Sequence, residues 1–131
     1  MAGETSLGCV LLVEDDAAFS ALLAEHLRRQ HIDVLRAETG VAAWNLLREG
    51  RHRIDLVLSD LRMPRLGGLD LLALLQADGH VPFVLMSAFV DPMVAEAAHE
   101  LGAIAVLSKP FELDALTALT RTVLARRHGA H

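Results

Sequence analysis

The chain has one cysteine, no tyrosine and no long hydrophobic run. The single cysteine, Cys9, excludes an intrachain disulfide framework, so a reducing compartment, the cytoplasm, is the expected location. No apolar stretch approaches the roughly 18 residues that a membrane span requires. The opening residues, MAGETSLG, also lack the basic and apolar regions of a secretory signal, so we expect no membrane association.

Positive charge is also scarce, because 12 basic residues stand against 17 acidic ones, for a formal net charge of -5. The arginines are scattered, whereas a nucleic-acid surface needs clustered lysine and arginine, so we expect no direct binding of nucleic acids. The 131 residues, 53% of them hydrophobic, suffice for one domain with its own core. We expect a single domain over 1–131, with a core at about 9–127 and loose ends at 1–8 and 128–131.

Short apolar runs alternate with segments of helical periodicity along the chain. Several of these runs are apolar on both faces, as strands are when helices cover both sides of a sheet. The alternation therefore predicts an α/β domain built around a doubly wound parallel sheet. The five expected strands lie at 9–13, 33–37, 54–59, 82–87 and 103–108.

The segments between these runs show the stripes of amphipathic helices. In the first segment, steps of three and four residues predict one inward stripe, made of Phe19, Leu22, Leu23, His26 and Leu27. Asp91 followed by Pro92 predicts the start of the fourth helix, because aspartate caps helices and proline fits their first turn. The fifth helix is expected at about 112–127.

Polar residues that carry chemistry follow four of the expected strands. Ligands of doubly wound sheets gather outside the carboxyl ends of the strands, so these side chains are expected to share one cleft. The set is Glu14 and Asp15 after the first strand, Asp60 after the third, Ser87 after the fourth and Lys109 after the fifth.

Three carboxylates in one cleft favour a hard divalent cation. Like charges a few ångströms apart raise one another's pKa, and a cation removes that cost. Oxygen ligands suit Mg²⁺ or Mn²⁺, and the pattern holds no nearby histidine or cysteine for zinc. A carboxylate in such a site can attack phosphorus and form an acyl phosphate, while Lys109 and Ser87 offset charge on the phosphoryl oxygens.

Each of these features also has a plain structural interpretation. The acidic run from Glu14 to Asp16 fits a solvated helix N-terminus, where carboxylates complement the helix dipole, and we interpret Asp16 in this way. Asp60 taken alone fits a turn or an N-cap, and Lys-Pro-Phe at 109–111 fits a plain loop before a helix. Their joint placement at strand ends favours one common site.

Four segments in combination resemble the receiver domains of two-component response regulators, in particular the single-domain chemotaxis regulators. They are LLVEDD at 11–16, DLVLSDLRMPRLGGLDLL at 55–72, PFVLMSA at 82–88 and GAIAVLSKPF at 102–111. The resemblance covers the chain from Cys9 to about Arg127. It implies a flavodoxin-like (βα)5 three-layer sandwich, whose parallel five-stranded sheet has the order 2-1-3-4-5.

The resemblance implies a role in phosphoryl transfer for three residues. Asp60 aligns with the phosphoacceptor, which takes a phosphoryl group from the phosphohistidine of a histidine kinase or phosphotransfer protein. Ser87 aligns with the hydroxyl that hydrogen-bonds a phosphoryl oxygen, and Lys109 with the lysine that pairs with the phosphoryl group. The family usually has the bond from this lysine to the following proline, here Pro110, in cis.

A Mg²⁺ site, which Mn²⁺ could also fill, is implied by the same resemblance. Asp15 and Asp60 align with direct ligands, and Glu14 with a partner that acts through water. Arg62 stands where a backbone carbonyl completes the metal shell. These implied ligands are all oxygen atoms, as the residues alone also suggest.

The sequence departs from the family at Val106, where a tyrosine or phenylalanine usually stands. That ring normally moves inward on phosphorylation, so the usual coupling to the face made by the fourth helix, fifth strand and fifth helix is expected to be altered. Two residues beyond Asp60 and Ser87 stand Arg62 and Phe89, at positions that tune the lifetime of the acyl phosphate. Both are bulky, and we hypothesise that they hinder water and prolong the phosphorylated state.

Other functional classes fit less well. A flavin-binding module on this fold would need a hydroxyl- and glycine-rich phosphate loop where the chain has three acids. An aspartyl phosphatase would carry a second acid at the position of Arg62. A degenerate receiver that only docks would not need the full set of acids, Ser87 and Lys109.

We therefore expect a signalling phosphoacceptor rather than an enzyme, although it would catalyse its own phosphorylation and dephosphorylation. Phosphorylation would shift its surface between two conformations that a downstream protein distinguishes. We expect a monomer or weak homodimer. A single-domain regulator is favoured, and the alternative is a receiver fragment of a larger transcriptional regulator or hybrid histidine kinase.

Overall fold

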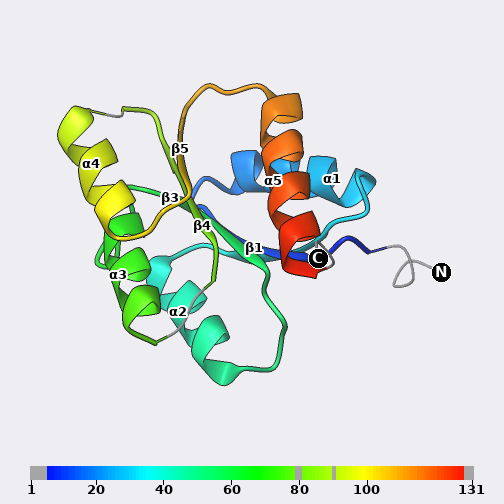
Figure 1. The fold of residues 1–131 in the computed structure, drawn as a ribbon, viewed down its shortest axis with the longest axis horizontal. Coiled ribbons are helices and arrows are strands. Elements are labelled where there is room, and N and C mark those ends of the chain that lie inside the picture. Colours follow the sequence, from blue (N-terminus) through cyan, green and yellow to red (C-terminus); the bar gives the residue numbers. More distant parts are fainter. Residues whose placement is uncertain (1–5, 79–80, 90, 129–131) are drawn as a thin grey trace.

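The computed structural model describes residues 6–78, 81–89 and 91–128. Strands and helices alternate over this part of the chain, as the pattern of apolar runs predicts (Figure 1). The strands are β1 (Cys9–Val13), β2 (Asp33–Ala37), β3 (Leu56–Asp60), β4 (Phe83–Ser87) and β5 (Ala105–Ser108). The helices are α1 (Ala17–Arg29), α2 (Gly40–Glu49), α3 (Gly68–Asp78), α4 (Pro92–Glu100) and α5 (Leu113–His128).

The strands form one parallel sheet in the order β2-β1-β3-β4-β5, which confirms the predicted topology. β1 and β2 have the predicted bounds, whereas β3, β4 and β5 begin one or two residues later than predicted. At β5 the reason is local: the backbone N–H of Ala103 donates to the carbonyl of Ala98 and so belongs to the turn that closes α4. Apolar character alone does not distinguish such a turn from the strand that follows it.

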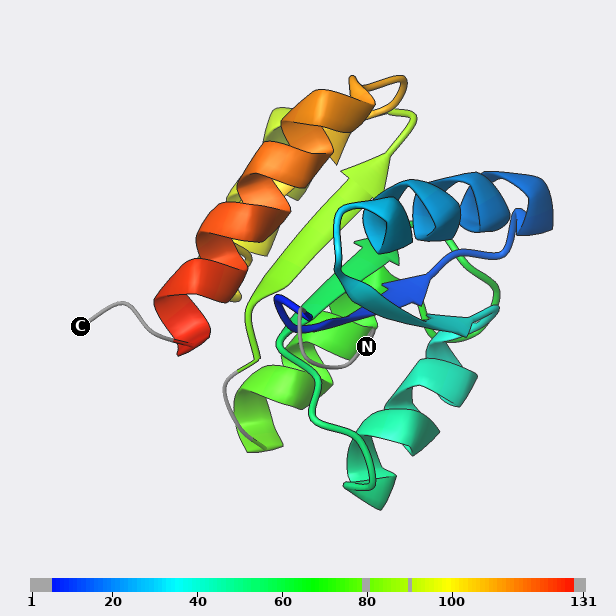
Figure 2. The same ribbon diagram turned by 90° about the vertical axis from the view of Figure 1, so that its right-hand side faces the viewer.

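Helices cover both faces of the sheet and make a three-layer sandwich. α1 and α5 lie on one face, and α2, α3 and α4 on the other (Figures 1 and 2). Alternate residues of β1 serve the two cores, with Val10 and Leu12 packed in the first and Leu11 and Val13 in the second. This explains why the strands are apolar on both faces.

The buried stripe of α1 is narrower than predicted. Leu23, Ala24 and Leu27 are fully buried, but Leu22 is 53% exposed, so the expectation that it points inward is wrong. The buried residues follow one another at steps of three and four from Ser20, and Leu22 lies one residue away from that series. The prediction for Asp91 is confirmed, because its side chain accepts a hydrogen bond from Val94 N at the start of α4.

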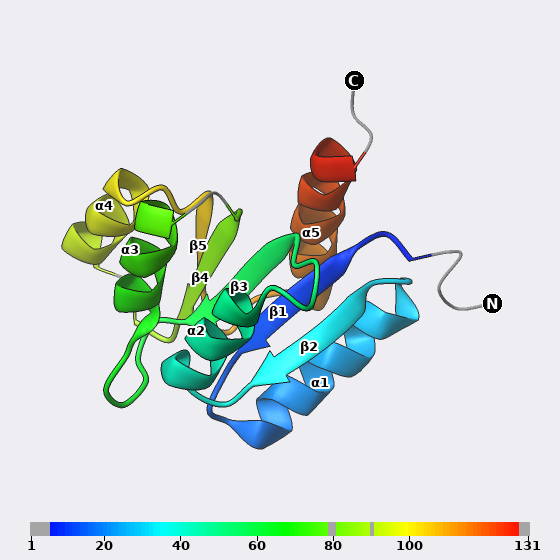
Figure 3. The ribbon, with the colours of Figure 1, turned by 90° about the horizontal axis from the view of Figure 1, so that it is seen from below.

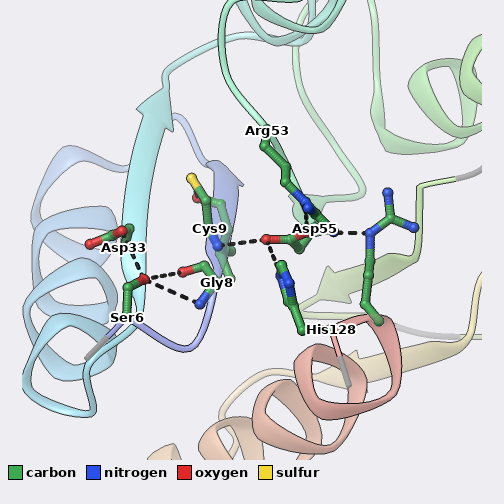
Figure 4. Close-up of polar contacts among 9 residues, drawn as sticks. Ser6, Gly8, Cys9, Asp33, Arg53, Asp55 and His128 are labelled. Atoms are coloured by element: carbon green, nitrogen blue, oxygen red, sulfur yellow. Dashed lines mark hydrogen bonds and ion pairs between the residues drawn. The ribbon is translucent and has the colours of Figure 1, made fainter. Parts of the chain in front are cut away.

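The described residues near the two ends of the domain contact the rest of the fold. Leu7 N donates to the carbonyl of His31 at 2.8 Å, and the Ser6 hydroxyl donates to Asp33 at 2.8 Å. At the other end, His128 contacts the carboxylate of Asp55 at 2.9 Å (Figure 4). Residues 6, 7 and 128 are thus in contact with residues next to or within the sheet, while 1–5 and 129–131, also expected to be loose, lie outside the described residues.

Among the described residues, no helix combines the length and apolar character that a bilayer crossing requires. The longest, α5, carries the polar residues Asp114, Arg121, Arg126 and Arg127.

Candidate functional site

The sheet brings the predicted polar residues to one edge. The strands are parallel, and the register pairs Val13 with Ser59, Asp60 with Met86 and Ser87 with Ser108, so their carboxyl ends coincide. Lys109 N donates to the carbonyl of Ser87 at 2.7 Å, which ties the segment after β5 to the end of β4. The β3–α3 loop extends past this edge (Figure 3).

Glu14, Asp15 and Asp60 form a cluster of carboxylates at this edge. One oxygen from each lies within 4.8 Å of the others. Glu14 is buried, Asp60 is half-buried, and Asp15 is exposed to solvent. The prediction that these three acids converge is therefore confirmed by their geometry, and their donor set is all oxygen, as Mg²⁺ and Mn²⁺ prefer.

Lys109 faces two of these acids. Its ammonium lies 2.7 Å from Glu14 Oε1 and 3.5 Å from Asp60 Oδ1. The peptide bond from Lys109 to Pro110 is cis, as the family resemblance implied. The cluster thus places three carboxylates against this one ammonium group, which leaves an excess of negative charge.

The pKa values reflect this imbalance. Burial raises the pKa of Asp60, the nearby charge of Asp15 raises it further, and Lys109 offsets only part of the effect. Burial also raises the pKa of Glu14, against the opposing hydrogen bonds from Lys109 and Asp16. For Lys109 burial opposes the charged form, but Glu14 and Asp60 outweigh it and raise its pKa. A cation beside the acids would relieve the repulsion between them.

Glu14 differs from the other two acids because both of its oxygens already accept hydrogen bonds. Oε1 accepts from Lys109 and Oε2 accepts from Asp16 N at 3.0 Å. Asp16 in turn caps α1, since its side chain accepts from Phe19 N at 3.1 Å. The interpretation of Asp16 as a helix-start residue is thereby confirmed.

Ser87 lines a pocket together with Asp60 and Lys109, but its hydroxyl points toward the loop that follows β4. It donates to the carbonyl of Phe89 at 2.8 Å and accepts from Phe89 N at 3.2 Å. The pocket is open and has a volume of about 350 Å³. It is lined by Asp60, Arg62, Ser87, Ala88, Phe89 and Lys109, which brings both predicted lifetime-tuning residues to its rim.

Gly68 allows the β3–α3 loop to pack closely behind Asp60. A Cβ atom at this position would lie 2.5 Å from the carbonyl oxygen of Asp60, which no side chain tolerates. The N–H of Gly68 donates to the carbonyl of Leu61 at 2.9 Å. The glycine thus allows α3 to begin directly behind Asp60 and contributes to the placement of that residue.

Two phenylalanines at the site were not predicted as part of it. The Lys109 ammonium lies 4.6 Å from the centroid of the Phe19 ring, and that ring meets Phe111 edge-on at a centroid distance of 6.0 Å. The sequence assigned Phe19 only to the inward stripe of α1. At Val106, where the family usually has a ring, a half-buried valine side chain lies on β5.

Residues 10–121 match the response regulator receiver domain family. The chain is a receiver domain of the response regulator family. Among curated relatives, the receiver domain is 36% identical over 117 residues to the DNA-binding response regulator MtrA of Mycobacterium tuberculosis. It is 35% identical over 119 residues to the transcriptional regulatory protein CpxR of Escherichia coli. These alignments cover 89% and 91% of this receiver domain and half of each relative.

Solved structures show the same architecture. The receiver domain of Francisella response regulator 1452 superposes with a TM-score of 0.84 at 25% identity, covering 91% of this chain and 98% of the other. The signal receiver domain of a putative Luxo repressor protein from Vibrio parahaemolyticus gives 0.83 at 26% identity, covering 94% and 98%. The predicted flavodoxin-like sandwich is therefore confirmed.

Proposed function

We propose that this receiver domain accepts a phosphoryl group on Asp60 from the phosphohistidine of a histidine kinase or phosphotransfer protein. The observation that carries the proposal is the excess of carboxylates around Asp60, beside one ammonium group and an open pocket. In the transfer, an Asp60 oxygen forms a bond to phosphorus while the bond from phosphorus to the histidine nitrogen breaks. The electron pair of that bond leaves with the imidazole, which takes up a proton from solvent.

The residues present fit a Mg²⁺ ion, or Mn²⁺ in its place. Asp15 and Asp60 would bind it directly, together with the backbone carbonyl of Arg62. Glu14 would act through water, since Lys109 and Asp16 already occupy both of its oxygens. When bound, the metal ion would offset negative charge on the phosphoryl oxygens, which is the main requirement of phosphoryl transfer.

Lys109 and Ser87 would stabilise the transferred group. Lys109 lies within reach of Asp60 and would pair with a phosphoryl oxygen. The Ser87 hydroxyl has a single proton, which it donates to Phe89, so it must rotate away from that carbonyl to donate to a phosphoryl oxygen. Phosphorylation would therefore break a contact of the β4–α4 loop.

The output of this domain would be a change of surface rather than the turnover of a substrate. It would catalyse only its own phosphorylation and dephosphorylation. The face made by α4, β5 and α5 is the proposed partner surface, and Val106 would make its coupling to Asp60 differ from the ring-based relay of the family. A single-domain regulator in the cytoplasm, monomeric or weakly dimeric, is the form we propose.

A receiver within a longer regulator is the second candidate. It is favoured by the relatives MtrA and CpxR, because the chain spans about half the length of each. Their names describe DNA-binding and transcriptional regulation. In that case Asp60 would control a further domain, and this receiver would not itself contact nucleic acids.

The proposal is tested by incubating the protein with Mg²⁺ and acetyl phosphate and measuring its intact mass. We expect the mass of one added phosphoryl group, absent from Asp60→Asn and retained in Asp55→Asn, which makes the same chemical change at the other end of the sheet. No addition to the wild-type protein, or an addition that persists in Asp60→Asn, would contradict the proposal.

A further inference from the structure

The ammonium of Lys109 is held by an aromatic ring as well as by acids. Lys109 is the single lysine of the chain. Its Nζ lies 4.6 Å from the centroid of the Phe19 ring, within the roughly 6 Å at which a cation is attracted to the negative face of an aromatic ring. The same ammonium contacts Glu14 at 2.7 Å and Asp60 at 3.5 Å.

The Phe19 ring is itself fixed in place. Phe111, which follows the Lys-Pro pair, meets it with an interplanar angle of 63°, the edge-to-face arrangement that aromatic pairs prefer. The backbone of Phe19 is held as well, because its N–H donates to the N-cap Asp16. Asp16 N donates to Glu14, so the ring and the acid that contact Lys109 belong to one hydrogen-bonded segment.

An aromatic face has an advantage over another carboxylate at this position. It attracts the ammonium without adding a formal negative charge, whereas a fourth acid would repel the incoming phosphoryl group. It also takes up no conventional hydrogen bond from the ammonium, whose three N–H groups stay available for oxygen acceptors. A lysine side chain has many rotamers, and the ring restricts them before the phosphoryl group arrives.

We propose that Phe19 is a positioning residue for phosphoryl transfer, which holds the Lys109 ammonium in reach of Asp60, and that Phe111 supports its ring. This role rests on the proposed function of Asp60 as phosphoacceptor. With acetyl phosphate as donor, an Asp60 oxygen bonds to phosphorus, the bond from phosphorus to the acetyl oxygen breaks, and acetate leaves with its electron pair. Lys109 offsets the charge on the phosphoryl oxygens during this exchange.

The first test replaces Phe19 with mono-, di- and trifluorinated phenylalanine by site-specific incorporation. Fluorine weakens the negative ring face stepwise with little change in size. We expect the rate constant for phosphorylation at saturating acetyl phosphate, in Mg²⁺, to fall stepwise by roughly fivefold across the series. The acetyl phosphate concentration for half-maximal rate and the thermal unfolding midpoint should stay nearly constant, since packing is preserved.

The second test observes Lys109 without any phosphodonor. Labelling with ¹³C- and ¹⁵N-lysine gives one set of side-chain NMR signals, because the chain has one lysine. The ring current of Phe19 should shift the Lys109 Cε proton signals upfield. We expect this shift to be lost in Phe19→Leu, kept in Phe19→Trp, and unchanged in the control Phe89→Leu, which replaces the phenylalanine that lines the pocket.

The outcomes separate the two proposals. Phosphorylation of the wild-type protein with equal rates across the fluorinated series would overturn the positioning role alone. An unchanged Lys109 signal in Phe19→Leu would overturn it as well. A wild-type protein that takes no phosphoryl group would overturn the proposed function and, with it, the positioning role.

Discussion

Carboxylates lie at both ends of the sheet, but the two ends differ in their balance of charge. At the carboxyl end, Glu14, Asp15 and Asp60 form one cluster, and the Lys109 ammonium pairs with Glu14 and Asp60 only. At the amino end, the buried carboxylate of Asp55 is surrounded by donors (Figure 4). These are Cys9 N at 2.9 Å, Arg53 at 3.1 Å, Arg127 at 3.4 Å and His128 at 2.9 Å.

The pKa directions follow this contrast. Burial raises the pKa values of Glu14 and Asp60, and their partners do not compensate. Burial also opposes the charge of Asp55, but hydrogen bonds from Cys9 N, His128 and Arg53 outweigh it and lower the pKa. An acid whose donors match its charge ties the structure together, whereas a cluster with excess charge is suited to bind a cation and a reactive group. Burial also raises the pKa of the neighbouring Cys9 thiol to about 11, which disfavours the reactive thiolate at neutral pH.

Among the substitutions, the largest expected effect on stability is that of a change at the amino end of the sheet. Asp55→Asn removes the charge that Arg53, Arg127 and His128 share, and hydrogen bonds to a charged group each contribute about 1.5 to 3 kcal/mol. Because these partners retain access to solvent, we expect a loss of about 2 kcal/mol in the free energy of unfolding. Urea unfolding at neutral pH measures it. An Asp55→Asn protein as stable as the wild type would show that this carboxylate does not hold the ends of the domain.

Two residues that line the pocket at the carboxyl end of the sheet should control how long the phosphorylated state lasts. Arg62 and Phe89 line the pocket at Asp60, and we expect them to hinder the attacking water. Replacing both with alanine should speed the loss of the phosphoryl group about tenfold, which corresponds to about 1.4 kcal/mol in the barrier. Decay of the phosphorylated mass after removal of the donor measures the rate. An unchanged decay rate would rule out this hypothesis.

Removing one charge from the carboxyl end of the sheet should raise the free energy of unfolding, whereas Asp55→Asn should lower it. Asp15→Asn relieves the repulsion that raises the pKa of Asp60. In metal-free buffer at neutral pH we expect the free energy of unfolding to rise by up to about 1 kcal/mol, as suits a pair of like charges near solvent. The same urea measurement decides it, and a loss of stability like that of Asp55→Asn would remove the distinction between the two ends.

The pH dependence of the free energy of unfolding should also differ between the two ends of the sheet. We expect this difference to be smaller than the effects of the substitutions above. The pKa of Asp55 is lowered on folding. Its contribution to the free energy of unfolding is therefore fully present above about pH 3.9, the pKa of aspartate in an unfolded chain, and is lost as the pH falls through the pKa in the folded protein. The pKa values of Glu14 and Asp60 are raised on folding. Their contribution to the free energy of unfolding is therefore present below about pH 4 and is lost as the pH rises through their pKa values in the folded protein.

Unfolding measured along an acid series tests these signs in metal-free buffer. The stability difference between wild type and Asp55→Asn should shrink only below about pH 4. The gain from Asp15→Asn should be largest near neutral pH and shrink on acidification, because protonation of Asp60 ends the repulsion. A gain that grows on acidification would contradict the assignment of raised pKa values to this cluster.

Much of the fold and of the site was predictable, because both depend on local pattern. The lengths of the apolar runs and the period of the segments between them placed the strands to within two residues. Parallel strands bring their carboxyl ends together, so Asp15, Asp60, Ser87 and Lys109 had to lie near one another. The four segments at the strand ends, in combination, indicated the family, and the match over residues 10–121 confirms it.

The remaining features depend on side-chain directions and on contacts between distant residues. Leu22 is exposed because α1 is rotated so that Leu23 and Leu27 face the sheet. The Ser87 hydroxyl points to Phe89 through a rotamer that spacing does not specify. Phe19 meets Lys109 ninety residues further along the chain, and such a pair becomes visible only when the helix and the loop are placed in three dimensions.

Binding of Mg²⁺ to the unphosphorylated protein tests most directly the contrast in charge between the two ends of the sheet. Thermal or urea unfolding should show a stabilisation that grows with the Mg²⁺ concentration and reaches about 2.7 kcal/mol at about 100 times the dissociation constant. We expect this gain in the wild type and, by the same amount, in Asp55→Asn, and we expect its loss in Asp15→Asn. A wild type without the gain, or an Asp15→Asn protein that keeps it, would contradict the account of the carboxyl end as a cation site.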